Sequence, residues 1–283
     1  MSERIYDKDM KITDNVMRGL KAAADFILPR VCVVCGRRLL LDETVMCLHC
    51  LADLPLTHFW KQKCNPMADR FNAVIQHGLE KAWEAYAAEV GDVEGGGGIF
   101  PHICLPLNAH ERYAYAAALF FYSHEADFRH ILYSLKYHSN TAAGEHFGRM
   151  LGRKMAGAEH FKDVDVVIPV PLHWTRKWSR GYNQAEYIAK TLATELGAQI
   201  RKDILLRRRR TSTQTKVDVE QKGKNVHGAF EAVVPEHMPA HILIVDDVFT
   251  TGSTLSACHE ALRKALPASV RISIATLGYV GRA

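Results

Sequence analysis

The chain has 283 residues, enough for one α/β domain with a smaller attachment. Hydrophobic residues make up 48% of it and charged residues 24%, which excludes a largely disordered or collagen-like protein. The formal net charge of +5 is mild, so the composition permits a phosphorylated ligand or nucleic acid but requires neither.

The start of the sequence, residues 1–4, is polar, and no apolar segment typical of a secretory signal follows it. The longest apolar stretch, residues 114–122, is about half as long as the roughly 20 residues that cross a bilayer. We therefore expect a soluble, cytoplasmic protein without a membrane span. An apolar stripe at helical spacing over residues 14–28 predicts a helix in an N-terminal segment, 1–30, and Pro29 ends it.

Four cysteines form two C-x2-C pairs with eleven residues between the pairs: Cys32, Cys35, Cys47 and Cys50. Each pair lets two thiolates converge from one tight turn, and four thiolates complete a tetrahedron around Zn2+ with no open position. In a chain without an export signal, this clustering favours a structural metal site over disulfide bonds. We predict one zinc ion in a ribbon domain over residues 31–60, with unligated thiols or another metal as the alternative.

A further segment, residues 61–105, separates the ribbon from the rest of the chain. Its Ala- and Glu-rich part predicts a helix that runs from residue 72 towards residue 100. The four consecutive glycines at 95–98 cost too much backbone entropy to lie inside an element. We therefore interpret residues 61–105 as a linker or insertion at a domain boundary and assign it no function.

From residue 106 to residue 283 the pattern changes to alternating strands and helices. The clearest strands are continuous apolar runs at 116–122, 164–170, 241–245 and 270–277, and the clearest amphipathic helices are 187–196 and 255–266. Strands that are apolar on both faces and separated by helices predict an α/β fold with a parallel sheet covered on both sides. Ligands of such sheets bind beyond the carboxyl ends of the strands.

The stretch after the predicted strand 241–245 is the most informative one. Asp246 and Asp247 stand at its carboxyl end, and consecutive carboxylates suit a ribose diol or a hydrated Mg2+. A turn then opens a helix, and it consists of Thr250, Thr251, Gly252, Ser253 and Thr254. Backbone N–H groups, hydroxyls and a helix N-terminus that converge in this way are typical of a phosphate site. The alternative is that the acids cap the strand and the turn caps the helix.

Together the two parts predict a site for ribose 5-phosphate. The sequence has no G-x-x-x-x-G-K-[ST] motif, which disfavours a P-loop nucleotide-binding protein. No G-x-G-x-x-G motif follows a predicted strand, which disfavours a dinucleotide-binding fold.

The run V-D-D-V-F-T-T-G-S-T at 245–254 resembles the motif with which type I phosphoribosyltransferases bind 5-phosphoribosyl 1-pyrophosphate (PRPP). Further segments and the cysteine ribbon narrow the resemblance to the ComF family. These segments are L-K-Y-H at 135–138, I-P-V-P-L-H at 168–173 and R-G-Y-N-Q at 180–184. The resemblance covers nearly the whole chain except about residues 73–105. It implies a type I phosphoribosyltransferase fold over residues 106–283, with a flap over the ligand.

By this resemblance, Asp246 and Asp247 bind the ribose hydroxyls of PRPP, which carries Mg2+, and the turn at 250–254 binds its 5-phosphate. Arg176 and Arg180 stabilise the leaving pyrophosphate, to which a planar guanidinium group can donate two hydrogen bonds. The two aspartates and the two arginines are therefore the expected catalytic residues.

Two more residues are assigned to PRPP. Lys136 either reaches the same pyrophosphate or is an ordinary surface lysine. Gln214 lies in the polar segment 207–227, where the family has a mobile flap that excludes water, although the family's S-Q-T signature is altered here. Asn183 and Gln184 are expected to cap or orient the following helix rather than contact the ligand.

Two functions remain open at this point. The first is transfer of the phosphoribosyl group to an unidentified nitrogenous acceptor, with release of pyrophosphate and no identifiable general base. The second is a non-catalytic protein that keeps the PRPP pocket and acts in DNA uptake or processing through DNA or a protein partner. The family is named after competence, the uptake of transforming DNA, and the four arginines at 207–210 and the zinc ribbon would serve this role. We interpret the arginine run first as a solvated or pyrophosphate-facing stretch, because it lacks interleaved aromatic residues. A homo-oligomer is compatible with either function.

Overall fold

The computed structural model describes residues 29–90, 113–137, 140–172, 181–207 and 228–281. The predicted N-terminal helix at 14–28 and the glycine run at 95–98 lie outside these ranges. No helix in the described ranges combines the length and the apolarity that a bilayer crossing needs.

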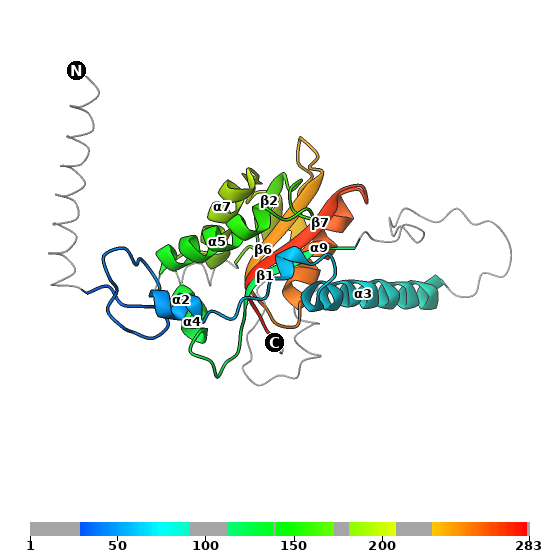
Figure 1. The fold of residues 1–283 in the computed structure, drawn as a ribbon. Helices are drawn as coiled ribbons and strands as arrows, with labels where there is room; N and C mark the ends of the chain where they lie inside the picture. The colour runs from blue at the N-terminus through cyan, green and yellow to red at the C-terminus, as the bar shows by residue number, and fades with distance from the viewer. Residues whose placement is uncertain (1–28, 91–112, 138–139, 173–180, 208–227, 282–283) are drawn as a thin grey trace, which may run out of the picture.

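A five-stranded parallel sheet forms the centre of the molecule, with strand order β1-β7-β6-β2-β3 (Figure 1). Its strands are β1 (Ala116–Phe121), β2 (Val166–Pro169), β3 (Gln199–Ile200), β6 (His241–Phe249) and β7 (Arg271–Tyr279). Every neighbouring pair is parallel. A small antiparallel sheet pairs β4 (Leu205–Arg207) with β5 (Phe230–Ala232). The predicted α/β fold with a parallel sheet is confirmed.

Helices cover both faces of the sheet, as the apolar runs of the strands predict. On one face lie α4 (Arg129–Tyr137), α5 (Thr141–Ala156) and α7 (Gln184–Leu196), and on the other lie α3 (Pro66–Val90) and α9 (Ser253–Ala265) (Figure 1). Residues along β6 alternate between the two layers: Leu243 and Val245 pack with the first, and Ile242 and Ile244 with the second. This period of two explains why the strand must be apolar throughout.

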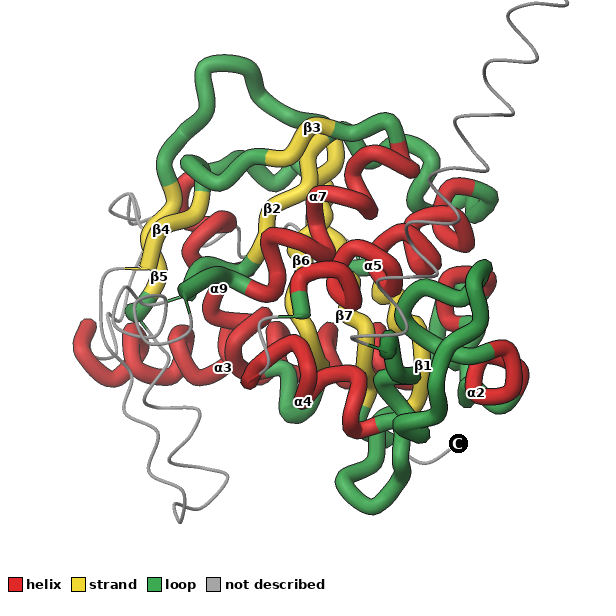
Figure 2. Tube along the Cα trace, turned by 90° about the vertical axis from the view of Figure 1, so that its left-hand side faces the viewer, coloured by secondary structure: helices red, strands yellow, loops and turns green. Residues whose placement is uncertain are grey.

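The cysteine segment contains a short helix, α2 (Leu48–Ala52), and leads through the 3-10 turn η1 (Phe59–Lys61) to α3. Its buried residues belong to the same hydrophobic cluster as α4, α5 and α7. In Figure 2, α2 and the small β4–β5 sheet lie at opposite sides of the molecule.

The chain between the ribbon and η1 covers the edge of the main sheet. Thr57 N–H donates to the carbonyl of Leu119 at 3.1 Å, and Phe121 N–H donates to the carbonyl of Pro55 at 2.8 Å. Because β1 is the edge strand, these bonds pair backbone groups that would otherwise be open to another chain. The ribbon is thus joined to the sheet by hydrogen bonds as well as by apolar contacts.

Helix α3 differs from the sequence expectation in its bounds and in its environment. It begins at Pro66 rather than near residue 72, because Asn65 caps it by accepting from Met67 N–H at 3.1 Å and from Ala68 N–H at 3.0 Å. The Asn65 amide also donates to the carbonyl of Ala116 at 2.9 Å.

About two turns further along α3, Asn72 bonds both backbone groups of Ala114, each at 3.0 Å. Met67 and Phe71 on the same helix are fully buried against the sheet. The start of α3 is therefore packed against the sheet and hydrogen-bonded to the segment that leads into β1. The division of the chain into domains at residues 30, 60 and 105 stays a prediction.

Candidate functional site

Strand β6 carries Asp246 and Asp247 near its carboxyl end, where a parallel sheet binds its ligands. The strand runs on past the acids to Phe249, four residues beyond the predicted end, and Asp246 stands beside Thr276 of β7. Both carboxylates are therefore held by a fixed ladder rather than by a loose loop.

The two acids form one electrostatic unit with Lys136 at the end of α4. Lys136 Nζ lies 3.0 Å from Asp247 Oδ2, and the two side chains are only 27% and 13% exposed. The backbone N–H of Asp247 donates to Asp246 Oδ1 at 2.8 Å. Burial, and next the neighbouring Asp247 charge, raise the pKa of Asp246 to about 7, against the lowering effect of Lys136 and Arg207. The unit thus combines the ion pair of Lys136 and Asp247 with Asp246, a carboxyl group whose pKa is raised.

The turn after β6 has a shape that requires glycine. Gly252 has φ +82°, and a Cβ atom there would lie 2.8 Å from the ring of Phe249. Gly252 is also the N-cap of α9, and as a glycine it contributes no side-chain cap. Thr251 Oγ1 and Ser253 Oγ lie 3.0 Å apart across the turn. Thr251 Oγ1 accepts from Ser253 N–H at 3.5 Å, so a hydroxyl of the turn reaches the first residue of the helix, as the alternative interpretation expects. The 13-residue helix also directs its N-terminus at this turn, as a phosphate site requires.

Arg70 of α3 holds the turn from outside, and the sequence analysis missed it. Its guanidinium group donates to the carbonyl of Thr250 at 2.9 Å and to the carbonyl of Val280 at 2.8 Å. It also lies 5.6 Å from the ring centres of Phe249 and Tyr279. No local pattern could reveal this contact, because 180 positions separate Arg70 from Thr250.

The described residues of the R-G-Y-N-Q segment, 181–184, bond to neighbouring elements and not to the acidic pair or the turn. Asn183 is the N-cap of α7: its side-chain oxygen accepts from Ala185 N–H at 3.2 Å, and its amide donates to the carbonyl of Val170 at 3.0 Å. The predicted capping role of Asn183 is confirmed. The hydroxyl of Tyr182 donates to the carbonyl of Leu135, which ties α4 to this segment.

The structure therefore brings together Asp246, Asp247, Lys136 and the turn at 250–254. Arg176, Arg180 and Gln214 lie outside the described residues, so their assignment to PRPP stays a prediction. The pairing of Lys136 with Asp247 places this lysine at the acidic pair and not at an isolated surface position.

The four cysteines of the ribbon converge as predicted. The Sγ atoms of Cys32, Cys35, Cys47 and Cys50 all lie within 4.8 Å of one another, and Cys35 Sγ and Cys47 Sγ are 3.8 Å apart. Four zinc–sulfur bonds of about 2.3 Å in a tetrahedron place the sulfur atoms about 3.8 Å apart, so the cluster fits zinc. All four positions would be filled by protein, as in a structural site.

Hydrogen bonds prepare this cluster for metal. Cys47 N–H donates to Cys32 Sγ at 3.4 Å, and Cys50 N–H donates to Cys47 Sγ at 3.5 Å. Burial raises the pKa of Cys47, but hydrogen bonds from Cys50 and from the neighbouring thiols outweigh it and bring the pKa to about 6. Glu43 closes the knuckle by accepting from Leu40 N–H at 2.8 Å and from Leu48 N–H at 2.7 Å.

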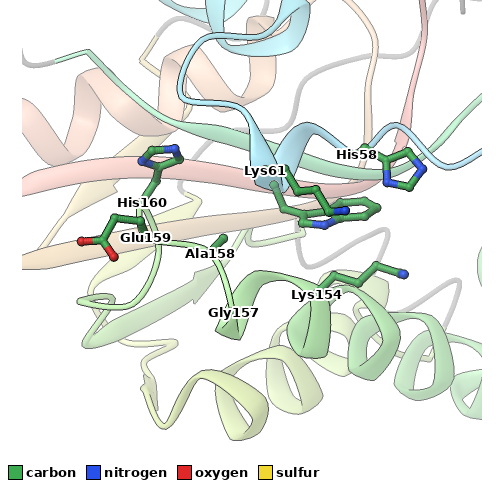
Figure 3. Close-up of a pocket in the computed structure, with 8 residues that line it drawn as sticks. His58, Lys61, Lys154, Gly157, Ala158, Glu159 and His160 are labelled. Atoms are coloured by element: carbon green, nitrogen blue, oxygen red, sulfur yellow. The ribbon is translucent and has the colours of Figure 1, made fainter.

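A cavity of about 500 Å3 lies elsewhere, between η1 and the end of α5 (Figure 3). Lys154 lies over the Trp60 ring at 5.2 Å, and His160 contacts Tyr115 just before β1 begins, with ring centres 5.0 Å apart. The cavity is thus near the starts of the strands, whereas the carboxylates are near their ends. We assign it no part in the site.

Comparison with known proteins defines the class to which the sheet, the acidic pair and the turn belong. Residues 183–281 match the family model of the phosphoribosyl transferase domain, and this range contains Asp246, Asp247 and the turn. The chain therefore carries a phosphoribosyl transferase domain, as the resemblance implied.

Individual relatives narrow the class. The chain is 38% identical to Competence protein F of Haemophilus influenzae over 102 residues, which are 35% of this chain and 44% of that protein. It is 29% identical to DNA utilization protein YhgH of Escherichia coli O157:H7 over 145 residues, 50% of this chain and 63% of that protein. YhgH of Salmonella typhi matches over the same shares. The chain is thus homologous to Competence protein F and YhgH, which confirms the resemblance to the ComF family, and it spans about half the length of these relatives.

Proposed function

We propose that the carboxyl end of β6 and the N-terminus of α9 bind PRPP together with Mg2+. The observation that carries the proposal is the acidic pair shortly before a turn that leads into α9, a helix whose N-cap is a glycine. Asp246 and Asp247 accept hydrogen bonds from the ribose hydroxyls, and the turn receives the 5-phosphate on its backbone N–H groups. Carboxylate oxygens also suit Mg2+, which neutralises the pyrophosphate charge when bound.

The reaction that this arrangement supports is transfer of the phosphoribosyl group to a nitrogenous acceptor. The bond from C1 of the ribose to the pyrophosphate oxygen breaks, and its electron pair leaves with pyrophosphate. The acceptor nitrogen forms the new bond to C1 and releases its proton to solvent. Lys136 adds positive charge near the acidic pair, and Arg176 and Arg180 are proposed to take up the charge of the leaving group.

Thermal unfolding with and without PRPP and Mg2+ tests binding. A ligand at 100 times its dissociation constant stabilises a protein by about 2.7 kcal/mol, which is roughly 5–10 °C at this size. The double variant Asp246→Asn/Asp247→Asn should lose this shift. Asp203→Asn, an exposed carboxylate paired with Arg201, is the matched control and should keep it. A wild-type protein with zinc bound and no shift would contradict the proposal.

A second candidate has the same pocket but no transfer reaction. It is favoured by the names of the relatives, a competence protein and a DNA utilization protein. In this case PRPP regulates or stabilises a protein that acts in DNA uptake or processing through DNA or a protein partner. Pyrophosphate release in the presence of nitrogenous bases and amines supports the transferase. Binding of PRPP without release, together with salt-dependent retention of DNA, supports the second candidate.

A further inference from the structure

Arg70 joins three parts of the molecule that are far apart in the sequence. Besides the carbonyls of Thr250 and Val280, its guanidinium group reaches the hydroxyl of Tyr279 at 3.3 Å. Phe249 lies beneath it, and the same ring would be 2.8 Å from any Cβ at Gly252. The turn that precedes α9 is therefore held between an aromatic ring and an arginine supplied by another helix.

The hydrogen bond to Thr250 fixes the direction of one peptide group in this turn. No cis peptide occurs in the described residues, and in a planar trans peptide the C=O and the next N–H point in opposite directions. Since the Thr250 carbonyl points towards Arg70, the N–H of Thr251 points away from it. An anion-binding turn needs this arrangement, with carbonyls outside and N–H groups inside.

We propose that Arg70 is a positioning residue for the proposed PRPP site: it turns the peptide between Thr250 and Thr251 so that the turn presents N–H groups to the 5-phosphate. The inference rests on the proposed function. It adds that binding of one end of PRPP depends on a residue of α3. Arg70 acts on the ribose 5-phosphate end of PRPP and not on the pyrophosphate end.

An arginine that merely braces the fold would behave differently. Two of its three hydrogen bonds go to Tyr279 and Val280 at the end of β7, so its loss will also reduce stability. A loss of stability alone weakens all ligands alike. Loss of the positioning of the turn weakens the binding only of ligands that have a 5-phosphate. This selectivity separates the two roles.

The test measures binding of three probes by calorimetry: PRPP with Mg2+, ribose 5-phosphate, and inorganic pyrophosphate with Mg2+. Arg70→Ala should weaken PRPP and ribose 5-phosphate about tenfold or more, the size of one lost charge-assisted hydrogen bond, and leave pyrophosphate unchanged. Arg70→Lys keeps the charge but cannot bond two carbonyls at once with a planar group. We therefore expect a smaller loss of affinity for the same two ligands and none for pyrophosphate. Arg70→Lys carries the test if the alanine variant does not fold.

Arg153→Ala is the matched control, because Arg153 is an exposed helical arginine whose Nε lies 3.3 Å from Glu195 on the α5–α7 side. It should leave all three affinities unchanged. Equal affinities of wild type and Arg70 variants for ribose 5-phosphate would overturn the role of Arg70 while the proposed function stands. An equal loss for pyrophosphate would overturn it in favour of a bracing role. A wild-type protein that binds neither PRPP nor ribose 5-phosphate would instead contradict the proposed function, and the inference with it.

Discussion

Asp246 keeps its proton to an unusually high pH for a carboxyl group, because the folded protein buries it beside a second carboxylate. Its pKa rises from an ordinary 3.8 to about 7. Between these two values the unfolded chain has released a proton that the folded chain still holds. The free energy of unfolding therefore decreases as the pH rises from about 4 to about 7. The site carries a stability cost at neutral pH when no ligand is bound.

We expect Asp246→Asn to remove this cost. The ligand-free variant should melt higher than wild type, by the largest margin at pH 8, on the order of 5 °C, and by a smaller margin at pH 5, because the unfolded chain releases the proton from about pH 4 upward. Melting temperatures from pH 5 to pH 8 measure the difference. Asp203, whose pKa its bond to Arg201 lowers to about 2, provides the control: Asp203→Asn should not show this dependence in the same range. Parallel curves for wild type and Asp246→Asn would contradict the prediction.

Gly252 is required both by its positive φ and by the lack of space for a Cβ atom, and a comparison with Gly197 separates the two effects. Both have positive φ, +82° and +68°, but a Cβ at Gly197 would meet nothing within 4 Å. Gly197→Ala should cost about 1–2 kcal/mol in the free energy of unfolding, the cost of the left-handed backbone. Gly252→Ala should cost about 2–4 kcal/mol, because the ring of Phe249 must also move. Urea unfolding measures both values.

The same two variants separate stability from binding. Gly252→Ala should lose the thermal shift with PRPP and Mg2+, whereas Gly197→Ala should keep it, because only Gly252 belongs to the turn before α9. Equal shifts in the two variants would show that the backbone of this turn does not contact the ligand.

Among the elements, we expect the ribbon to depend on a bound metal and the main domain to depend on the ribbon. The short helix α2 and the knuckles around the cysteines contain too little apolar surface to be stable alone. Their buried residues nevertheless belong to one cluster with α5 and α7, which contains Met46, Leu54, Phe147 and Leu192. Loss of the metal would therefore open one side of the domain core.

We expect one zinc ion per chain by elemental analysis, lost in Cys47→Ser. Removal of zinc with a chelator should lower the melting temperature of the whole protein in a single transition, because ribbon and helices share a core. Cys64→Ser is the control, since Cys64 is an exposed cysteine outside the cluster, and its zinc content should equal that of wild type. Two separate transitions, or an unchanged melting temperature, would show that the ribbon is an independent unit.

At the scale of the whole molecule, we expect that the domain predicted at 106–283 cannot fold without the residues before it. Its edge strand β1 relies on Pro55 and Thr57 for backbone pairing and on Asn65 and Asn72 for further hydrogen bonds. A fragment without these residues exposes a strand edge and the apolar face that α3 covers.

We therefore expect a fragment of residues 106–283 to aggregate or to remain partly unfolded, whereas residues 29–283 form a soluble, cooperatively melting protein. Circular dichroism and size-exclusion chromatography of the two fragments measure this difference. A monomeric 106–283 fragment with a sharp thermal transition would contradict the prediction and would confirm the domain boundary near residue 105.

Features that depend on residues close together in the chain could be predicted from the sequence. The acidic pair and its turn, the two cysteine pairs and the cap at Asn183 each depend on neighbours within a few positions. Features that join distant residues could not. Periodicity shows that a helix is amphipathic but not which strand it covers, so α3 was interpreted as an insertion.

Arg70 illustrates the limit most clearly. Its partners are backbone carbonyls, and every residue has a carbonyl, so the sequence contains no complementary residue type to search for. Lys136 was a candidate only through the resemblance, which assigned it to the pyrophosphate, and its contact with Asp247 was not predicted.

The position of β7 in the sheet has a consequence for biosynthesis. Strand β7 lies between β1 and β6, yet it follows β1 by roughly 150 residues. At ribosomal rates of about 5–20 residues per second, β1 waits roughly 10–30 s for the strand beside it. Segments already synthesised, the one around Pro55 and Thr57 and the start of α3, can shield β1 during this time. The ribbon and its following segment thus provide β1 with an early partner while the nascent chain is still on the ribosome.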